Sequence, residues 1–126
     1  MRRFTALGAV AMLLALAPQA RAATPAIAEQ EAAYLIAAVE ASGCLFYRNG
    51  MRYDAARAAA HLREKYALVA TGNAIVTGEA FIEKVATKSA FTGLPYEIDC
   101  PGHARVTVAT WLSDVLARHR AEEAPR

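Results

Sequence analysis

Apolar residues recur at helical spacing in four stretches of this chain. The first opens at Thr24-Pro25, a capping residue followed by proline at the first helical position, and the second covers residues 55–69. The third follows Thr77 and the fourth follows Thr107, two further capping residues. We expect four amphipathic helices, the first with Glu31 off its apolar face. The residues predicted to face the core are Ile27, Tyr34, Leu35, Ala38, Val39, Ala55, Ala59, Leu62, Tyr66, Val69, Phe81, Ile82, Val85, Ala86, Val108, Trp111, Leu112, Val115 and Leu116.

Two short stretches on either side of Asn49-Gly50 have the alternation of a strand instead. Both turn residues tolerate the positive φ angle of a type I′ turn, so Cys44–Arg48 and Met51–Tyr53 are predicted to form a hairpin. An isolated hairpin is marginal in water, and the alternating stretch Tyr96–Cys100 can supply a third strand. The sequence therefore predicts an α+β fold, with about four helices packed on a small antiparallel sheet of hairpin 44–53 and strand 96–100.

Residues 1–22 have the form of a secretory signal peptide. Two arginines precede an apolar run over residues 6–17, and Ala20-Arg21-Ala22 matches a small-x-small cleavage site. The run is too short to anchor the protein across a bilayer, so no transmembrane segment is expected after cleavage. We predict export to the periplasm, a single domain over residues 23–120 and a polar tail over residues 121–126.

Removal of this leader changes the charge of the protein. The whole chain of 126 residues carries a formal charge of +2, and loss of Arg2, Arg3 and Arg21 leaves the mature chain at −1. A near-neutral domain without a basic run has no electrostatic footprint for DNA or RNA, so we exclude nucleic acid as a partner. Neither the composition nor any motif indicates a cofactor.

Cys44 and Cys100 are the two cysteines of the chain. An even count in an exported protein indicates first a disulfide, and this bond would tie the predicted third strand to the first. Two buried free thiols are an alternative that fits an oxidising compartment less well. A metal site is a weaker alternative, because neither cysteine has neighbours at metal-ligand spacing.

Two short motifs contain the residue types of an active site or a metal site. Lys88-Ser89 joins a base and a nucleophile, but adjacent residues of a helix diverge by about 100° and their side chains do not meet. We interpret Ser89 as a continuation of the inward face of the third helix. His61 and Glu64 lie one helical turn apart but lack a third ligand. We therefore predict neither catalytic residues nor a metal ion.

Basic residues gather around the hairpin and the second helix and form a candidate binding patch. They would lie beside Tyr53 and Tyr66, and such a mixture suits an anionic or sugar-bearing envelope ligand, or a protein partner that uses arginine and tyrosine anchors. The alternative is scattered surface charge over aromatic core residues. The predicted patch consists of Tyr47, Arg48, Arg52, Arg57, His61 and Lys65.

A larger set of residues carries a resemblance to a known family. These residues are Cys44, Phe46-Tyr47-Arg48-Asn49-Gly50, Tyr53, Ala59, His61-Leu62, Lys65-Tyr66, Phe81-Ile82, Ala86-Thr87-Lys88-Ser89, Gly93, Pro95-Tyr96, Cys100-Pro101-Gly102 and Trp111-Leu112. With them the chain resembles the YfeK-like family of small exported bacterial proteins, a domain of unknown function. The similarity runs from about Tyr34 to Arg120. It implies a periplasmic domain with paired cysteines, and no activity or catalytic residue follows from it.

These features predict a non-enzymatic interaction or accessory module of the bacterial cell envelope. A small periplasmic hydrolase or transferase is the first alternative, with Lys88, Ser89 and His61 as its candidate residues. A secreted inhibitor of an envelope-degrading enzyme is the second alternative, because the scaffold is small and predicted to be cross-linked.

Overall fold

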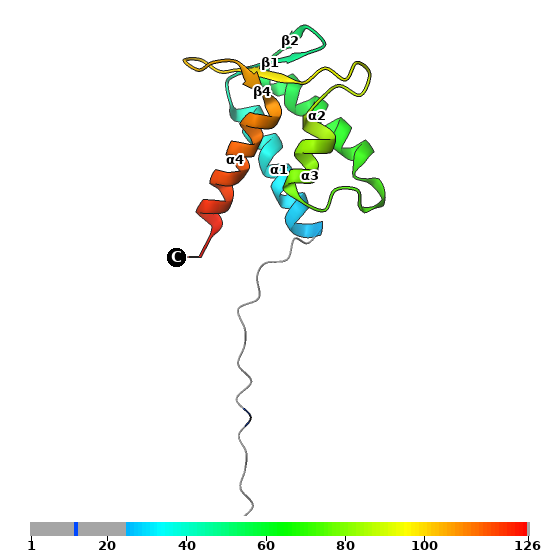
Figure 1. The fold of residues 1–126 in the computed structure, drawn as a ribbon, viewed down its shortest axis with the longest axis vertical. Helices are drawn as coiled ribbons and strands as arrows, with labels where there is room; N and C mark the ends of the chain where they lie inside the picture. Colours follow the sequence, from blue (N-terminus) through cyan, green and yellow to red (C-terminus); the bar gives the residue numbers. More distant parts are fainter. Residues whose placement is uncertain (1–11, 13–24, 126) are drawn as a thin grey trace, which may run out of the picture.

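In the described part of the chain, four short strands form one antiparallel sheet at one end of the molecule, and helices extend from it toward the other end (Figure 1). This computed structural model describes residues 12 and 25–125. The predicted signal peptide over residues 1–22 therefore lies, apart from Met12, outside the described residues. The predicted α+β class is confirmed. Among the described residues, no helix combines the length and the apolar character that crossing a bilayer requires.

The predicted hairpin is present as β1 (Leu45–Arg48) and β2 (Met51–Tyr53), joined by Asn49-Gly50. Both turn residues have positive φ angles, 53° and 77°. The predicted third strand is confirmed as β3 (Glu97–Asp99), which pairs antiparallel with β1. The sheet order is β2-β1-β3-β4, and β4 (Val106–Thr107) is a strand that the sequence analysis missed. Two residues are too few to show the alternation that identifies a strand.

The helices begin where their capping residues predict. Asp54 accepts a hydrogen bond from the N–H group of Arg57, and Thr77 and Thr107 cap the next helices in the same way. The last helix continues through the first three residues of the predicted polar tail. The helical segments are α1 (Pro25–Ala41), α2 (Ala55–Val69), the 3-10 turn η1 (Thr71–Asn73), α3 (Gly78–Phe81), the π-type turn η2 (Ile82–Ala86) and α4 (Val108–Glu123).

The predicted third helix changes its winding after one turn, where α3 passes into the wider η2. Thr87 Oγ1 donates a hydrogen bond to the carbonyl of Ile82 at 2.7 Å, which satisfies a free carbonyl group at this helix end. The helix ends before Ser89, so the interpretation of Ser89 as part of its inward face is wrong, although the side chain of Ser89 is buried.

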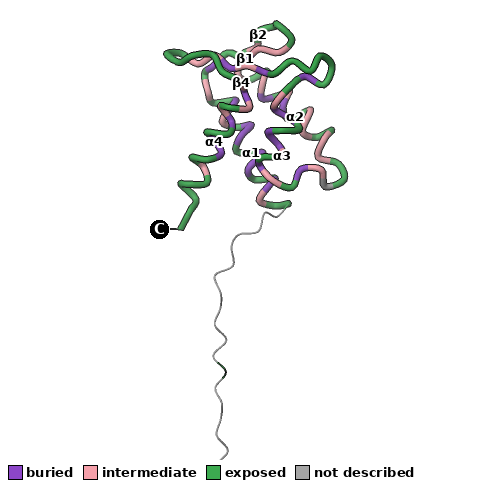
Figure 2. Tube along the Cα trace, in the orientation of Figure 1, coloured by how far each residue is buried: buried purple, intermediate pink, exposed green. Residues whose placement is uncertain are grey.

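The core lies among the helices and beneath the sheet, where the buried positions of α1, α3 and α4 face one another (Figure 2). Tyr34, predicted to face the core, is 40% exposed, and its ring stacks on that of His119. The largest fully buried side chains are those of Phe81, Leu35, Ile98, Leu112, Val39 and Val85. All but Ile98 were predicted from the helical pattern, and Ile98 is the inward residue of β3.

Glu31 is buried, with 7% of its surface exposed, and its predicted place off the apolar face is wrong. The guanidinium of Arg120 in α4 donates to both of its carboxylate oxygens, at 2.7 and 2.9 Å. Arg120 also donates to Glu79 in α3. One guanidinium therefore joins α1, α3 and α4, and we call this group the Arg120 clamp.

The disulfide between Cys44 and Cys100 is confirmed. Cys44 comes directly before β1, Cys100 comes directly after β3, and Leu45 pairs with Asp99 beside them. The bond therefore fixes the two central strands at the end where their pairing begins.

Candidate functional site

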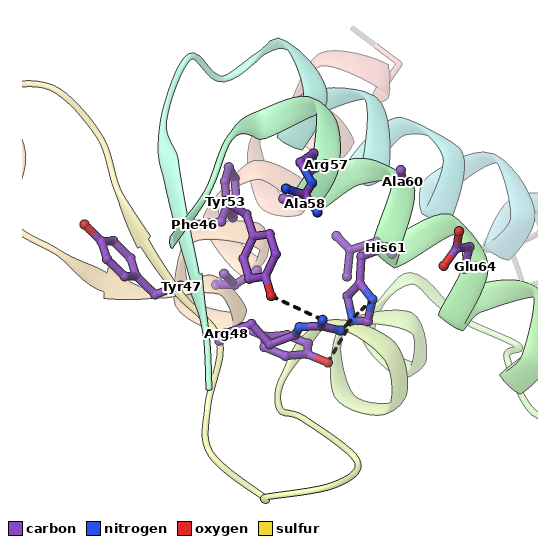
Figure 3. Close-up of a pocket in the computed structure, with 12 residues that line it drawn as sticks. Phe46, Tyr47, Arg48, Tyr53, Arg57, Ala58, Ala60, His61 and Glu64 are labelled. Atoms are coloured by element: carbon purple, nitrogen blue, oxygen red, sulfur yellow. Dashed lines mark hydrogen bonds between the residues drawn. The ribbon is translucent and has the colours of Figure 1, made fainter. Parts of the chain in front are cut away.

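A pocket of about 270 Å³ lies between the β1–β2 hairpin and α2 (Figure 3). We call it the Arg48 pocket. Phe46, Leu62 and Val108 form its apolar part. The polar residues that line it are Arg48, Tyr53, Arg57, His61, Glu64 and Tyr96.

The hydrogen bonds of the Arg48 guanidinium go to uncharged groups. Its Nη1 atom lies 2.9 Å from Nδ1 and 3.1 Å from Nε2 of His61, and its Nη2 atom donates to Tyr53 Oη at 3.4 Å (Figure 3). The guanidinium carbon also lies 5.3 Å from the centre of the Tyr53 ring, within range of a cation–π contact. Among the described residues Arg48 forms no salt bridge, so no carboxylate neutralises its charge.

Tyr96 and Lys65 extend this set of contacts. Nε2 of His61 lies 3.2 Å from Tyr96 Oη, and Lys65 Nζ donates to the same oxygen at 3.1 Å. Lys65 also donates to the backbone carbonyl of Lys88 at 2.6 Å. Arg48 and Lys65 thus stand on either side of the His61–Tyr96 pair, and no carboxylate in the described part of the chain forms a salt bridge with Lys65.

These surroundings favour a neutral His61. Burial lowers the pKa of His61 below its ordinary value of 6.5, the charges of Arg48 and Lys65 lower that pKa further, and Glu64 opposes them. Burial likewise lowers the pKa of Lys65 and raises the pKa of Tyr96. A neutral imidazole has a lone pair that can accept a hydrogen bond from Arg48, whereas an imidazolium has none.

Arg57 and Glu64 complete the polar lining of the pocket. The guanidinium carbon of Arg57 lies 5.4 Å from the centre of the Tyr53 ring, so two guanidinium groups contact one aromatic ring. Glu64 is the one carboxylate among the described lining residues, and it is exposed. The positive charges of Arg48, Arg57 and the adjoining Lys65 outnumber it, which favours a negatively charged ligand.

The structure brings four members of the predicted patch to the Arg48 pocket and places two on the outer face of the sheet. Tyr47 borders the pocket, but its ring points away from it (Figure 3), and Arg105 lies over that ring at 3.3 Å from its centre. Arg52 pairs with Tyr47 across the hairpin and therefore shares the outer face. Of the other four members, Arg48, Arg57 and His61 line the pocket, and Lys65 adjoins it through its hydrogen bond to Tyr96.

Lys88 and Ser89 are not arranged as a base and a nucleophile. Ser89 is 3% exposed, and its hydroxyl accepts hydrogen bonds from Asn49 Nδ2 at 3.2 Å and from the N–H group of Phe91 at 3.3 Å. Lys88 is exposed, and its backbone pairs with that of Pro95. No histidine or lysine of the described chain contacts the Ser89 hydroxyl, so this serine lacks the partner that nucleophilic catalysis requires.

His61 and Glu64 both line the pocket, one helical turn apart. Within the described residues no group of three or more His, Cys, Asp or Glu side chains is placed to hold a metal ion. The ring nitrogens of His61 contact Arg48 and Tyr96 instead.

Tyr96 is the site residue that the sequence analysis left out of the predicted patch. The spacing of the two cysteines could have predicted that Tyr96 lies at the site. If Cys44 and Cys100 face each other in an antiparallel pair, counting forward on one strand and backward on the other sets Arg48 opposite Tyr96. The register of Leu45 with Asp99 follows the same count.

Comparison with known proteins places the chain among proteins without an assigned function. Residues 26–120 match the model of the family of unknown function (DUF5329). The Salmonella typhimurium protein described as "Uncharacterized protein YfeK" is 44% identical over 64 residues, which are 51% of this chain and 52% of that protein. The chain thus matches about half the length of this curated relative, and no solved structure matches it. Since the family model extends from α1 into α4, the chain belongs to the DUF5329 family, and its resemblance to YfeK-like proteins is confirmed.

Proposed function

We propose that this protein is an exported, non-enzymatic module of the cell envelope that binds a small anionic ligand in the Arg48 pocket. The observation that carries the proposal is the half-buried residue Arg48, whose guanidinium bonds only to the uncharged side chains of His61 and Tyr53 among the described residues. A carboxylate or phosphate would supply the missing negative charge and accept charge-assisted hydrogen bonds.

The size of the pocket limits the ligand to a small molecule. Its volume of about 270 Å³ lies just below the range of about 300–1,000 Å³ that is usual for ligand pockets in proteins. The hydroxyl groups of Tyr53 and Tyr96 can bond to the hydroxyl groups of a sugar, while Phe46 and Val108 contact its apolar face. A single acidic or phosphorylated sugar fits both the volume and the lining.

Export is supported by the signal-peptide pattern of residues 1–22 and by the disulfide, since such bonds persist in oxidising compartments. The non-enzymatic part of the proposal is supported by the surroundings of Ser89 in the Lys88-Ser89 pair, the most enzyme-like motif of the sequence. The hydroxyl of Ser89 is buried and bonded to Asn49 and to the backbone of the loop that follows.

Titration calorimetry with glucuronate, inorganic phosphate and glucose tests the anion site. Glucuronate and glucose share a sugar ring and differ in the carboxylate, so we expect glucuronate to bind at least about tenfold more tightly, the typical value of one charge-assisted hydrogen bond. We expect inorganic phosphate to compete with glucuronate. Equal binding of glucose and glucuronate, or no heat from either anion at millimolar concentration, would contradict the proposal.

Two arginine variants locate the site on the molecule. Arg48→Ala should reduce glucuronate binding at least about tenfold, because it removes a half-buried cation that lines the pocket and has no carboxylate partner. Arg52→Ala is the matched control, since it removes the same charge from the outer face of the sheet. If both variants bind as the wild type does, the ligand site lies elsewhere.

A further inference from the structure

The loop between η2 and β3, over residues 88–95, lies at the sheet end of the molecule (Figure 1), and some of its apolar side chains are exposed. Phe91 is 97% exposed and Leu94 is 53% exposed. Met51, which is 62% exposed, follows the hairpin turn, and Asn49 of that turn bonds to the loop. We call Met51, Phe91 and Leu94 the apolar tip.

The loop carries Phe91 and Leu94 on a frame of internal hydrogen bonds. Ser89 N–H donates to the carbonyl of Leu94 at 3.0 Å, and Gly93 N–H donates to the carbonyl of Ser89 at 2.9 Å. The N–H groups of Phe91 and Leu94 donate to the hydroxyl groups of Ser89 and Thr92, at 3.3 and 3.2 Å. These four donors therefore need no water, which matters because an N–H group without a partner is costly in a lipid environment.

The charges near the tip are positive. Residues 45–53 and 87–96 contain Arg48, Arg52 and Lys88 and no aspartate or glutamate. Arg52 and Lys88 are exposed. Exposed apolar side chains beside lysine and arginine are the combination that binds anionic lipid headgroups, since apolar burial and electrostatic attraction then act together.

We propose that the apolar tip inserts into an anionic lipid surface, with Arg52 and Lys88 at the level of the headgroups. A lipid surface suits the tip better than a protein partner, because a stable protein interface buries about 800 Å² on each side, more than three exposed side chains provide. Internal bonding of the N–H groups of Ser89, Phe91, Gly93 and Leu94 lowers the cost of moving these groups out of water into lipid. Lipid binding by the tip does not depend on a ligand in the Arg48 pocket. It depends on the proposed function only in requiring that the chain is exported.

Sedimentation with vesicles tests the lipid surface directly. We expect the protein to sediment with vesicles of phosphatidylcholine and phosphatidylglycerol in equal amounts, and much less with phosphatidylcholine alone. Phe91→Ser should weaken this binding at least about tenfold, because the largest apolar side chain of the tip is lost. Leu68→Ser is the matched control, since Leu68 is 77% exposed and belongs to α2 instead of the loop or the hairpin.

A fluorescence measurement follows insertion of the loop itself. Phe91→Trp adds a second tryptophan to a chain whose natural one is Trp111, and we expect its emission to shift to shorter wavelength on the anionic vesicles. The wild type should show no shift. Unchanged melting temperatures of the variants would show that folding is intact, as expected for a side chain that is 97% exposed.

Two results would overturn the lipid proposal. One is equal sedimentation of the wild type and Phe91→Ser. The other is no binding to anionic vesicles, with Phe91-dependent crosslinking to an envelope protein instead, which would assign the tip to a protein partner. Failure of glucuronate to bind would leave the vesicle result unaffected, because the tip residues do not line the Arg48 pocket.

Discussion

Protonation of His61 would add a positive charge to the Arg48 pocket. The pKa of His61 in the folded protein lies below the ordinary value of 6.5, first because of burial and then because of Arg48 and Lys65. Neutral His61 therefore costs the folded protein no stability above pH 6.5. As the pH falls below that value, the unfolded chain takes up a proton more readily than the folded protein, and the free energy of unfolding declines. A bound anion acts in the opposite direction, because it stabilises the imidazolium.

We predict that glucuronate binds more tightly as the pH falls toward the lowered pKa of His61, and that the affinity levels off below it. The gain can reach about tenfold per pH unit, the limit for uptake of one proton on binding. His61→Gln should bind with nearly constant affinity over the same range, because glutamine does not titrate. Calorimetric titrations at several pH values provide the measurement, and identical pH profiles for the two proteins would exclude His61 as the titrating group.

Among the salt bridges that join secondary-structure elements in the described chain, the Glu31–Arg120 pair of the Arg120 clamp contains the most buried side chain, that of Glu31. The side chain of Glu31 is 9% exposed and that of Arg120 is 45% exposed. The contact with Arg120 is the largest cause that lowers the pKa of Glu31 and of Glu79 below 4.5. The stabilisation is therefore present above pH 4.5 and is lost as the pH falls through the lowered values.

We predict that Arg120→Ala costs about 1–3 kcal/mol of unfolding free energy at neutral pH, because it leaves a buried carboxylate without its partner. The variant should also lose less stability than the wild type on acidification. Arg63→Ala is the control, since the Arg63–Glu40 pair is 51% and 48% exposed and should contribute no more than about 1 kcal/mol. Urea unfolding at neutral and acidic pH measures both effects, and equal costs for the two variants would show that burial of Glu31 is unimportant.

Capping residues and turn residues predicted the helices and the hairpin well. The features that the sequence did not reveal, such as the burial of Glu31, depend on contacts between elements. Asp54 and Thr77 cap helices as their types predict, and Asn49-Gly50 forms the predicted turn. Glu31 was misplaced because its burial depends on Arg120, which lies far along the chain and packs against it only in the folded protein.

The predicted patch shows the same limit at the candidate site. Arg48 and Arg52 are close in sequence and alike in type, yet the alternation of the hairpin sends them to opposite faces of the sheet. The position of His61 on α2 could be read from helical spacing, but its contact with Tyr96 depends on the pairing of β1 with β3. Strand parity and the cysteine register were present in the sequence, and together they would have divided the patch correctly.

The two ends of the molecule differ in what they carry. The sheet end carries the Arg48 pocket and the apolar tip, whereas the start of α1 and the end of α4 lie at the opposite end (Figure 1). Seated on a lipid surface through the tip, the protein would hold the pocket close to the headgroups. Chemistry at the surface of a membrane would then be the natural source of its anionic ligand.

Export can be tested on the intact protein in its own cell. We predict that the protein is released by osmotic shock and that its mature chain begins at Ala23, because cleavage should follow Ala20-Arg21-Ala22. Mass spectrometry of the released protein without reductant should also find the Cys44–Cys100 peptide pair. Recovery of an uncleaved chain in the cytosolic fraction would contradict the proposed location.

The strand order β2-β1-β3-β4 governs when this domain can fold during synthesis. β1 lies between β2, its neighbour in the chain, and β3, which is made only after α2, η2 and the loop that follows them. Until β3 emerges from the ribosome, the hairpin is an isolated pair of strands and is marginal in water. A nascent chain whose sheet closes this late remains open while its amino end is already available to a translocation channel, as the proposed export in an unfolded state would require.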